Sequence, residues 1–265
     1  QTVGTDQERA VTAVHAALDA GVTLFDTADA YGPTSELGVN ERALVAALRS
    51  SPADLDRVVI ATKGGHTRSE NASWWVDGSP EHLAAAARDS LARLGLDALP
   101  LYQLHRPDPR VPFADSMGAM RQLVDDGIAR RIGVSNVSEE QLEVAIAIVG
   151  DALVSVQNEY AALARASEPV LRRCEQLGLA FLAWGPLGGR LAAKQLGDDA
   201  SVFGDVARAH GVSPQRVAIA WVLSASPVLI PIPGASRPES ILDSVAAVSL
   251  ELTDDGRRAL AGQAS

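Results

Sequence analysis

The sequence is poor in cysteine, has no excess of basic residues and contains no long apolar run. Its one cysteine, Cys174, excludes an internal disulfide and a zinc cluster built from cysteines. The formal net charge of −10 argues against a nucleic-acid partner, which requires a basic face. No apolar stretch is long enough to cross a bilayer, and no charged-then-apolar amino-terminal segment indicates secretion. We therefore expect a cytoplasmic protein with neither membrane nor nucleic-acid partners, and nothing indicates its oligomeric state.

Helical and strand patterns alternate along the chain. Hydrophobic residues make up 47% of the 265 residues, enough for the core of one domain over residues 1–265. Helices are indicated by caps, such as Ser79-Pro80 with Gly95 and the capping box from Ser138 to Gln141. They are expected over residues 6–21, 40–50, 79–95, 113–126, 138–150, 168–177, 213–223, 238–248 and 253–261. Short apolar runs rich in β-branched residues predict strands at 23–26, 58–63, 99–105, 132–135, 153–157, 179–184 and 228–232.

This alternation predicts a parallel sheet covered by helices, because parallel strands need crossover connections. About eight such units in about 250 residues form a (β/α)₈ TIM barrel, an α/β fold. A doubly wound open sheet is the alternative, but no G-x-G-x-x-G follows the first strand. One barrel strand is missing from the pattern, and the chain starts with Gln1 rather than methionine. We expect residues before Gln1 to supply that first strand.

Ionisable residues stand at the carboxyl ends of three successive predicted strands. These residues are Asp26, Lys63 and His105, and Tyr31 follows Asp26 in the adjoining loop. The carboxyl ends of barrel strands share one face, and neighbouring strands lie about 4.8 Å apart, so the four side chains are expected to converge. A lysine ammonium lowers the pKa of a neighbouring phenol, and a buried lysine needs a carboxylate partner to stay charged. The pattern predicts Tyr31 as a general acid tuned by Lys63 and Asp26, with His105 orienting the same oxygen.

Each of these residues also has an ordinary structural interpretation. Asp26 would cap a turn, Lys63 would form a structural ion pair and His105 would be a core histidine. Asp29 lies on a different face by strand alternation, and we expect it to be structural. Adjacent Trp74 and Trp75 precede a predicted helix and suggest a substrate wall, with packing of their own loop as the alternative. The other histidines share no ligand spacing, so no metal is expected.

Several motifs occur in a characteristic order and together resemble the aldo-keto reductase superfamily. The resemblance implies a barrel without a separate Rossmann domain that binds NADP(H) and reduces an aldehyde or ketone by hydride transfer. It implies that Tyr31 is the proton donor, that Lys63 and Asp26 tune its pKa, and that His105 orients the substrate carbonyl. The motifs are Asp26 with Tyr31, IATKGG around Lys63, LYQLHRPDP around His105, IGVSN at 132–136, Gln157-Asn158, WGPLGG at 184–189 and PIPGASRPE at 231–239.

The same resemblance implies a set of cofactor-binding residues. Ser135, Asn136 and Gln157 would hold the nicotinamide carboxamide, and Trp184 would stack on the ring. In many members a lysine and an arginine bind the 2′-phosphate of NADP(H), and this chain has Gly234 and Ser240 at those positions. Arg237 is therefore expected to bind that phosphate instead, and NAD(H) remains possible as the cofactor. The pyrophosphate would lie along Gly185, Pro186, Leu187, Gly188 and Arg190, and the adenosine end along Gly234, Ser236, Arg237, Ser240 and Asp243.

Two other functions compete with a carbonyl reductase. A regulatory protein similar to the potassium-channel β subunits would keep the fold and the cofactor but act by binding a partner. A lyase or aldolase would use Lys63 as an imine-forming nucleophile. Pairing with Asp26 argues against the second, because a charged lysine is a poor nucleophile. The small-molecule carbonyl substrate itself cannot be read from the sequence.

Overall fold

The computed structural model describes residues 7–32, 36–68, 73–189, 192–193, 196 and 201–262. Contacts divide the chain into two units. Unit 1 consists of Gln1–Val156 with Ser236–Pro238, and unit 2 consists of Gln157–Ala235 with Glu239–Ser265. The expectation of a single domain stays a prediction.

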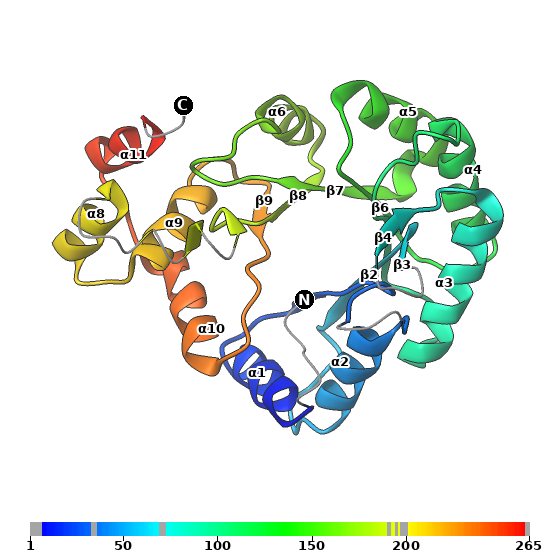
Figure 1. The fold of residues 1–265 in the computed structure, drawn as a ribbon, viewed down its shortest axis with the longest axis horizontal. Helices are drawn as coiled ribbons and strands as arrows, with labels where there is room; N and C mark the ends of the chain where they lie inside the picture. Colours follow the sequence, from blue (N-terminus) through cyan, green and yellow to red (C-terminus); the bar gives the residue numbers. More distant parts are fainter. Residues whose placement is uncertain are drawn as a thin grey trace. The chain divides into compact units, whose positions relative to one another are not determined.

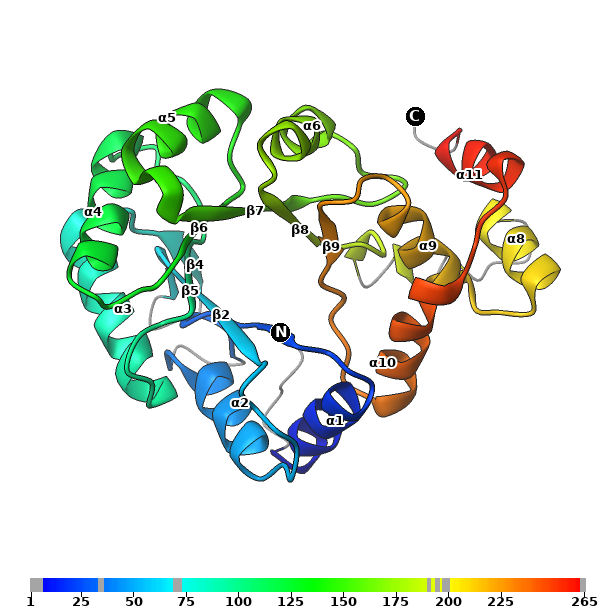
Figure 2. The same ribbon diagram turned by 180° about the vertical axis from the view of Figure 1, so that it is seen from behind.

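Unit 1 is a run of parallel strands with helices on their outer side. Strand β1 pairs with β2, β2 with β5 and β5 with β6, each in parallel register. Each of helices α1 to α4 contacts the next helix along the chain, and both views show these helices outside the strands (Figures 1 and 2). The elements are α1 (Gln7–Asp19), β1 (Leu24–Asp26), α2 (Val39–Arg49), β2 (Val59–Gly64), α3 (Pro80–Leu94), β5 (Leu101–Leu104), α4 (Phe113–Asp125), β6 (Ile132–Ser135), α5 (Glu139–Val149) and the short 3₁₀ helix η1 (Gly150–Ala152).

Caps fix the helix ends where the sequence predicts them. The Ser79 side chain accepts a hydrogen bond from the backbone N–H of His82, and Gly95 closes α3 in the left-handed conformation at φ 64°. The capping box between Ser138 and Gln141 is formed at the start of α5. Apolar side chains between the helices and strands form the core of the unit, among them Leu83, Leu94, Leu99, Met117, Met120 and Ile132.

A small antiparallel hairpin interrupts the alternation between β2 and α3. It consists of β3 (His66–Arg68) and β4 (Trp74–Val76), with Arg68 opposite Trp74 and Thr67 opposite Trp75. The sequence pattern did not predict it. Because successive side chains on a strand point to opposite faces, Trp74 and Trp75 face different ways.

Unit 2 repeats the strand–helix pattern around its own core. Strands β8 and β9 are parallel, and the Phe181 ring packs edge-on against Tyr160, which in turn stacks on Trp221. The sequence pattern missed helix α8. The elements are β7 (Leu153–Glu159), which contains the boundary between the units, α6 (Glu168–Leu177), β8 (Ala180–Trp184), α8 (Val202–His210), α9 (Pro214–Leu223), β9 (Leu229–Pro231), α10 (Pro238–Val245), the 3₁₀ helix η2 (Ala246–Ser249) and α11 (Asp254–Ala261).

The seven predicted strands are all present and form one sheet in the order β1-β2-β5-β6-β7-β8-β9. Each strand along the chain adds to the same side of the sheet. A doubly wound sheet would reverse direction at a switch point, so the strand order excludes that alternative. The predicted first strand falls outside the described residues. Within the described part of the chain, no helix has the length and apolar character needed to span a membrane.

Candidate active site

Lys63 is a buried cation held at the end of β2. Its side chain is 0% exposed, and Nζ lies 2.5 Å from Asp26 Oδ2 and 2.9 Å from the carbonyl oxygen of Thr27. Burial lowers the pKa of Lys63, but the Asp26 carboxylate and the Tyr31 hydroxyl together outweigh burial and raise it above its usual value. Lys63 is therefore charged at neutral pH. Gln103 on β5 also donates to Asp26, at 3.1 Å, and fixes the carboxylate from the other side.

The Tyr31 hydroxyl lies between two of the other predicted residues. It is 3.4 Å from Lys63 Nζ and 3.4 Å from His105 Nε2. Burial raises the pKa of Tyr31 by more than Lys63 lowers it, so the net pKa lies above that of a free phenol. The direction of the shift is therefore opposite to the expected lowering, mainly because Tyr31 is buried and in smaller part because the Asp26 charge also raises its pKa. Tyr31 is accordingly a fully protonated phenol at neutral pH.

His105 follows β5 and is a neutral imidazole. Its backbone N–H donates to the Gly64 carbonyl at 2.9 Å, and its ring stands edge-on to Tyr31 at a centroid distance of 5.4 Å. Burial, followed by the positive charge of Lys63, holds the pKa of His105 well below its usual value. A neutral imidazole carries one N–H donor and one acceptor. In the described part of the chain, no group bonds to its buried Nδ1, so Nε2 is the nitrogen engaged with Tyr31.

Two predicted cofactor residues lie beside His105. Asn136 Nδ2 donates to the His105 carbonyl and to Ser135 Oγ, both at 3.0 Å. Asn136 has a φ of 59°, the left-handed conformation that asparagine tolerates better than most residues. The turn after β6 thus brings Ser135 and Asn136 next to the group of Asp26, Lys63, Tyr31 and His105, called the tetrad below.

The hairpin places His66 and Arg68, which the sequence pattern did not identify as site residues, beside the predicted wall residue Trp74. The His66 ring lies 4.7 Å from the His105 ring and 4.9 Å from the Trp74 ring, measured between centroids. The Arg68 guanidinium lies over Trp74 at 4.5 Å and donates to the Gly32 carbonyl at 3.0 Å. Trp75 instead faces Arg110, at 5.6 Å. Of the two predicted wall residues, Trp74 is therefore the one linked to the tetrad, through His66.

Behind the tetrad lies a cluster of buried charges, of which sequence reasoning considered only Asp29, as a structural residue. Glu41 on α2 accepts from Thr62 Oγ1 and from Arg93 Nε, each at 2.6 Å. Arg93 reaches in from α3 across Gly38, where an added Cβ would lie 2.2 Å from Arg93 Cδ. Asp29 is 1% exposed, and within the described residues no donor reaches its Oδ1. An acidic residue in the first turn of a helix usually signals a solvated end, so the pattern gave no sign of this burial.

The predicted cofactor residues of unit 2 form a separate group. Gln157 is buried in β7, and Trp184 ends β8 half-buried, its carbonyl accepting from the Tyr160 N–H at 3.2 Å. The following turn closes by a 2.7 Å bond from the Gly188 N–H to the Gly185 carbonyl. Pro186 and Leu187 lie inside this turn, and Arg190 lies outside the described residues.

The predicted adenosine residues lie before and along α10. Gly234, Ser236 and Arg237 are exposed, and Ser240 is half-buried. The Asp243 carboxylate already has partners, because Oδ1 accepts from Arg216 at 2.8 Å and Ser213 Oγ donates to Oδ2. Contact of these residues with a nucleotide stays a prediction.

Comparison with known proteins decides the family. A model of the aldo/keto reductase family matches residues 1–261. The chain belongs to the aldo/keto reductase family. It is 35% identical to the 6-dehydroglucose reductase of Novosphingobium aromaticivorans over 245 residues, covering 89% of this chain and 79% of that protein. It is 34% identical to the pyridoxine 4-dehydrogenase of Escherichia coli over 256 residues, covering 94% and 85%.

A solved aldo/keto reductase from Klebsiella pneumoniae, in complex with NADP and acetate, has a TM-score of 0.79 to this chain. The two share 27% sequence identity, and the match covers 98% of this chain and 86% of that one. The solved neighbours are TIM barrels, which confirms the predicted α/β barrel class.

The local chemistry of this aldo/keto reductase fits a nicotinamide dinucleotide. Gly185 and Gly188 have φ values of 63° and 73°, and a Cβ at Gly188 would lie 2.9 Å from Ala192 Cβ. Glycines in this conformation carry no side chain that would keep a bound group away from the backbone. Ser135 and Asn136 supply a hydroxyl and an amide, the donors and acceptors that a carboxamide needs.

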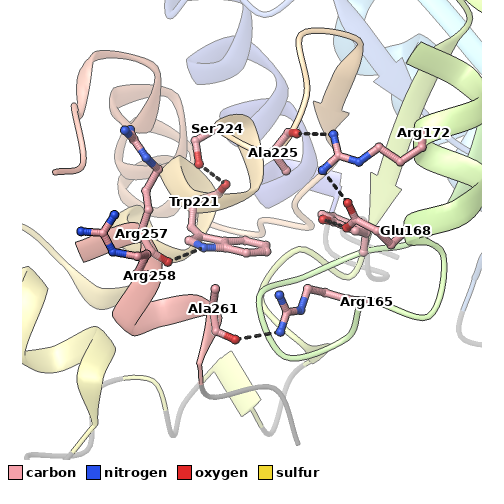
Figure 3. A pocket seen from close by; sticks show the side chains of 10 residues that line it. Arg165, Glu168, Arg172, Trp221, Ser224, Ala225, Arg257, Arg258 and Ala261 are labelled. Atoms are coloured by element: carbon pink, nitrogen blue, oxygen red, sulfur yellow. Dashed lines mark hydrogen bonds and ion pairs between the residues drawn. The ribbon is translucent and has the colours of Figure 1, made fainter. Parts of the chain in front are cut away.

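A cavity lies in unit 2, and none of the predicted site residues lines it. Its volume is about 510 Å³, and Trp221 lies among four arginines that line it (Figure 3). Those arginines are already engaged: Arg165 donates to the Ala261 carbonyl and Arg172 pairs with Glu168. Arg257 and Arg258 pair with Asp254 and Asp255. The phenol in this lining, Tyr160, donates a hydrogen bond to the Glu168 carboxylate, so the tetrad remains the candidate active site.

Proposed function

We propose that this chain reduces an aldehyde or ketone to an alcohol with NADP(H), using Tyr31 as the proton donor. The observation that supports the proposal is the position of one phenol hydroxyl 3.4 Å from both a charged lysine and a neutral histidine. That arrangement supplies a proton, a positive charge and a second donor at one point.

The proton transfer follows from the charge states of the tetrad. A carbonyl oxygen bound beside Tyr31 and His105 receives the phenol proton as negative charge develops on it. The resulting phenolate is stabilised by the Lys63 ammonium, whose charge Asp26 and the Thr27 carbonyl maintain. His105, being neutral, contributes an N–H to the same oxygen without adding a competing acid.

The cofactor and substrate sites are assigned by local chemistry. When bound, NADPH supplies the hydride for the carbonyl carbon. Ser135, Asn136 and Gln157 would hold its carboxamide, Trp184 its ring and the glycine turn after β8 its pyrophosphate. On the substrate side, we assign His66 and Trp74 to the approach to His105, because Trp74 is 40% exposed and His66 contacts both rings.

The competing functions have less support. An imine-forming lyase needs a neutral, reachable lysine, whereas Lys63 is fully buried and its pKa is raised. No observation favours a purely regulatory role, although such a protein would share the fold. The cytoplasmic location stays a prediction from the sequence.

The test is multiple-turnover oxidation of NADPH, and separately of NADH, with a panel of carbonyl compounds. The panel includes 6-dehydroglucose, and pyridoxine in the reverse direction, because two relatives are named for them. Tyr31→Phe keeps the ring but removes the proton, so turnover should fall about 10²–10⁴-fold with NADPH binding little changed.

Tyr102→Phe is the matched control. Its hydroxyl is buried in the same unit but contacts the Leu83 carbonyl rather than the tetrad, so this variant should retain most of its turnover. Near-normal turnover of Tyr31→Phe would refute the assignment of the acid. NADPH binding without turnover on any carbonyl compound would instead favour the regulatory alternative.

A further inference from the structure

Asp29 is a buried carboxyl that the proposed reaction does not use. It lies between β1 and α2, with the side chain 1% exposed and, among the described residues, no donor to Oδ1. Its backbone is fully engaged, because its N–H donates to the Lys63 carbonyl at 3.2 Å and its carbonyl accepts from the Gly38 N–H at 2.5 Å. Asp29 therefore joins the strand that carries Lys63 to the first turn of α2.

The charges around Asp29 do not balance if every acid is ionised. From α2 it faces Glu41, which is 0% exposed, and from α3 it faces Arg93, whose guanidinium is bonded to Glu41 and Ser90. From β2 it faces Lys63, whose ammonium is paired with Asp26. The buried phenol of Tyr102 on β5 and the phenol of Tyr31 complete the titratable groups around it. With Lys63 paired to Asp26, Arg93 is left as the cation for Glu41, to which it is bonded, and for Asp29, so these charges balance only when one of the two carboxyls is neutral.

Of the two carboxyls, Asp29 is the one that keeps a proton. Glu41 accepts two hydrogen bonds, one of them from the Arg93 guanidinium, whereas no donor among the described residues reaches Oδ1 of Asp29. Burial, with the neighbouring Glu41 charge, outweighs the hydrogen bond from the Ala30 backbone N–H and the positive charges of Arg93 and Lys63, and raises the pKa of Asp29 to about 8. Ionisation of Asp29 would place a second negative charge beside Glu41 in the closed interior.

We propose that Asp29 is protonated at neutral pH and acts as a positioning residue that keeps the Tyr31 segment seated on α2. The same helix turn holds both ends of this segment, because the Gly38 N–H donates to Asp29 and the Asn40 N–H donates to the Tyr31 carbonyl at 3.2 Å. If Asp29 ionises, its repulsion from Glu41 weakens these two hydrogen bonds and displaces the Tyr31 hydroxyl from Lys63 and His105. The inference rests on the proposed function for its effect on turnover, but not for the protonation itself.

The protonation is measured directly on the full chain, without any reaction. Carboxyl ¹³C NMR of the natural chain should show one aspartate titrating near pH 8, and that signal should be absent from Asp29→Asn. Asparagine copies the shape of a protonated carboxyl, so the variant tests charge rather than packing. If no aspartate titrates above pH 6, or if the signal persists in the variant, the proposal is overturned.

The linkage to stability has a definite sign. The folded-state pKa is raised, so stability from this proton is complete below the unfolded value near 4 and is lost as pH rises to about 8. The melting temperature of Asp29→Asn relative to the natural chain should therefore rise between pH 5 and pH 8, by at least about 2–4 °C. Asp125→Asn, which changes an exposed carboxylate on α4, should show no such trend. Parallel pH profiles for all three proteins would contradict the proposal.

Turnover provides the readout of positioning. With one ionisation near pH 8, about a tenth of the molecules keep the proton at pH 9, so kcat of the natural chain should fall about tenfold from pH 7 to pH 9. Asp29→Asn should lose much less over that range, because the pKa of Tyr31 is raised and the acid itself stays protonated. An equal loss in both proteins would refute the positioning role. If neither protein turns over any carbonyl compound, the proposed function fails, while the NMR and melting results still decide the protonation.

Discussion

Removal of the Arg93 guanidinium should cost far more stability than its place near the end of a surface helix suggests. Arg93 is 18% exposed, and its Nε lies 2.6 Å from Oε2 of Glu41, which is 0% exposed. Arg93→Ala leaves that carboxylate buried, with Thr62 as its side-chain donor among the residues that the structure describes. Breaking a buried pair from one side costs about 3–5 kcal/mol, and partial access of water to the guanidinium site favours the lower half of that range.

Arg88 on the same helix provides the matched control. It pairs with Asp126 at 3.3 Å, and both side chains are largely solvated, at 53% and 35% exposed. Arg88→Ala should cost no more than about 1 kcal/mol. For a chain of this size about 1 kcal/mol corresponds to 2–4 °C, so Arg93→Ala should melt about 6–16 °C lower and Arg88→Ala within about 4 °C of the natural chain.

Thermal melting followed by circular dichroism at pH 7 measures both variants. Arg93→Lys should recover part of the loss, because an ammonium restores the charge but cannot bond Glu41 and Ser90 in the same fork geometry. Equal losses for Arg93→Ala and Arg88→Ala would refute the reasoning, since they would mean that water reaches Glu41.

Two further predictions concern the reaction itself. Lys63→Met should lower turnover about 10²–10⁴-fold, as expected for Tyr31→Phe, because a buried phenol without a neighbouring positive charge holds its proton too tightly. Weaker substrate binding at unchanged kcat would contradict the proposal that Lys63 tunes Tyr31. Arg237→Ala should cost about 1.5–3 kcal/mol of NADPH binding and little of NADH binding, as measured by fluorescence titration. Equal losses for both cofactors would show that Arg237 does not read the 2′-phosphate.

The sequence predicted the strands and most helices because their signals are local. A short apolar run bounded by proline, glycine or a polar residue is enough to locate a buried parallel strand, and β6 was predicted with the observed bounds. The hairpin was missed because strands of three residues are shorter than the usual pattern. It is held by ring contacts between His66, Arg68 and Trp74, which are not visible as periodicity. Helix α8 has a cap at Ser201 and an end at Gly211, but Gly204 interrupts its pattern.

Some features of the candidate site could likewise be predicted from local sequence, and others could not. Asp26, Lys63 and His105 could be predicted because each is a polar residue closing an apolar strand, and the barrel brings strand ends together. The direction of the Tyr31 pKa could not, because it depends on how burial compares with a lysine charge that Asp26 already compensates. Asp29, Glu41 and Arg93 come from three elements, and nothing local in the sequence indicates that they meet.

Gly38 links the evolution of positions 29, 41 and 93, which are far apart in the sequence. A β-carbon at Gly38, where φ is 75°, would force the Arg93 side chain to shift from its position. A change at Gly38 is therefore expected to displace the Arg93 guanidinium, and Glu41 would then lose its charged partner. We expect positions 29, 38, 41 and 93 to change together or not at all during divergence, which makes their joint pattern a marker for reductases built this way.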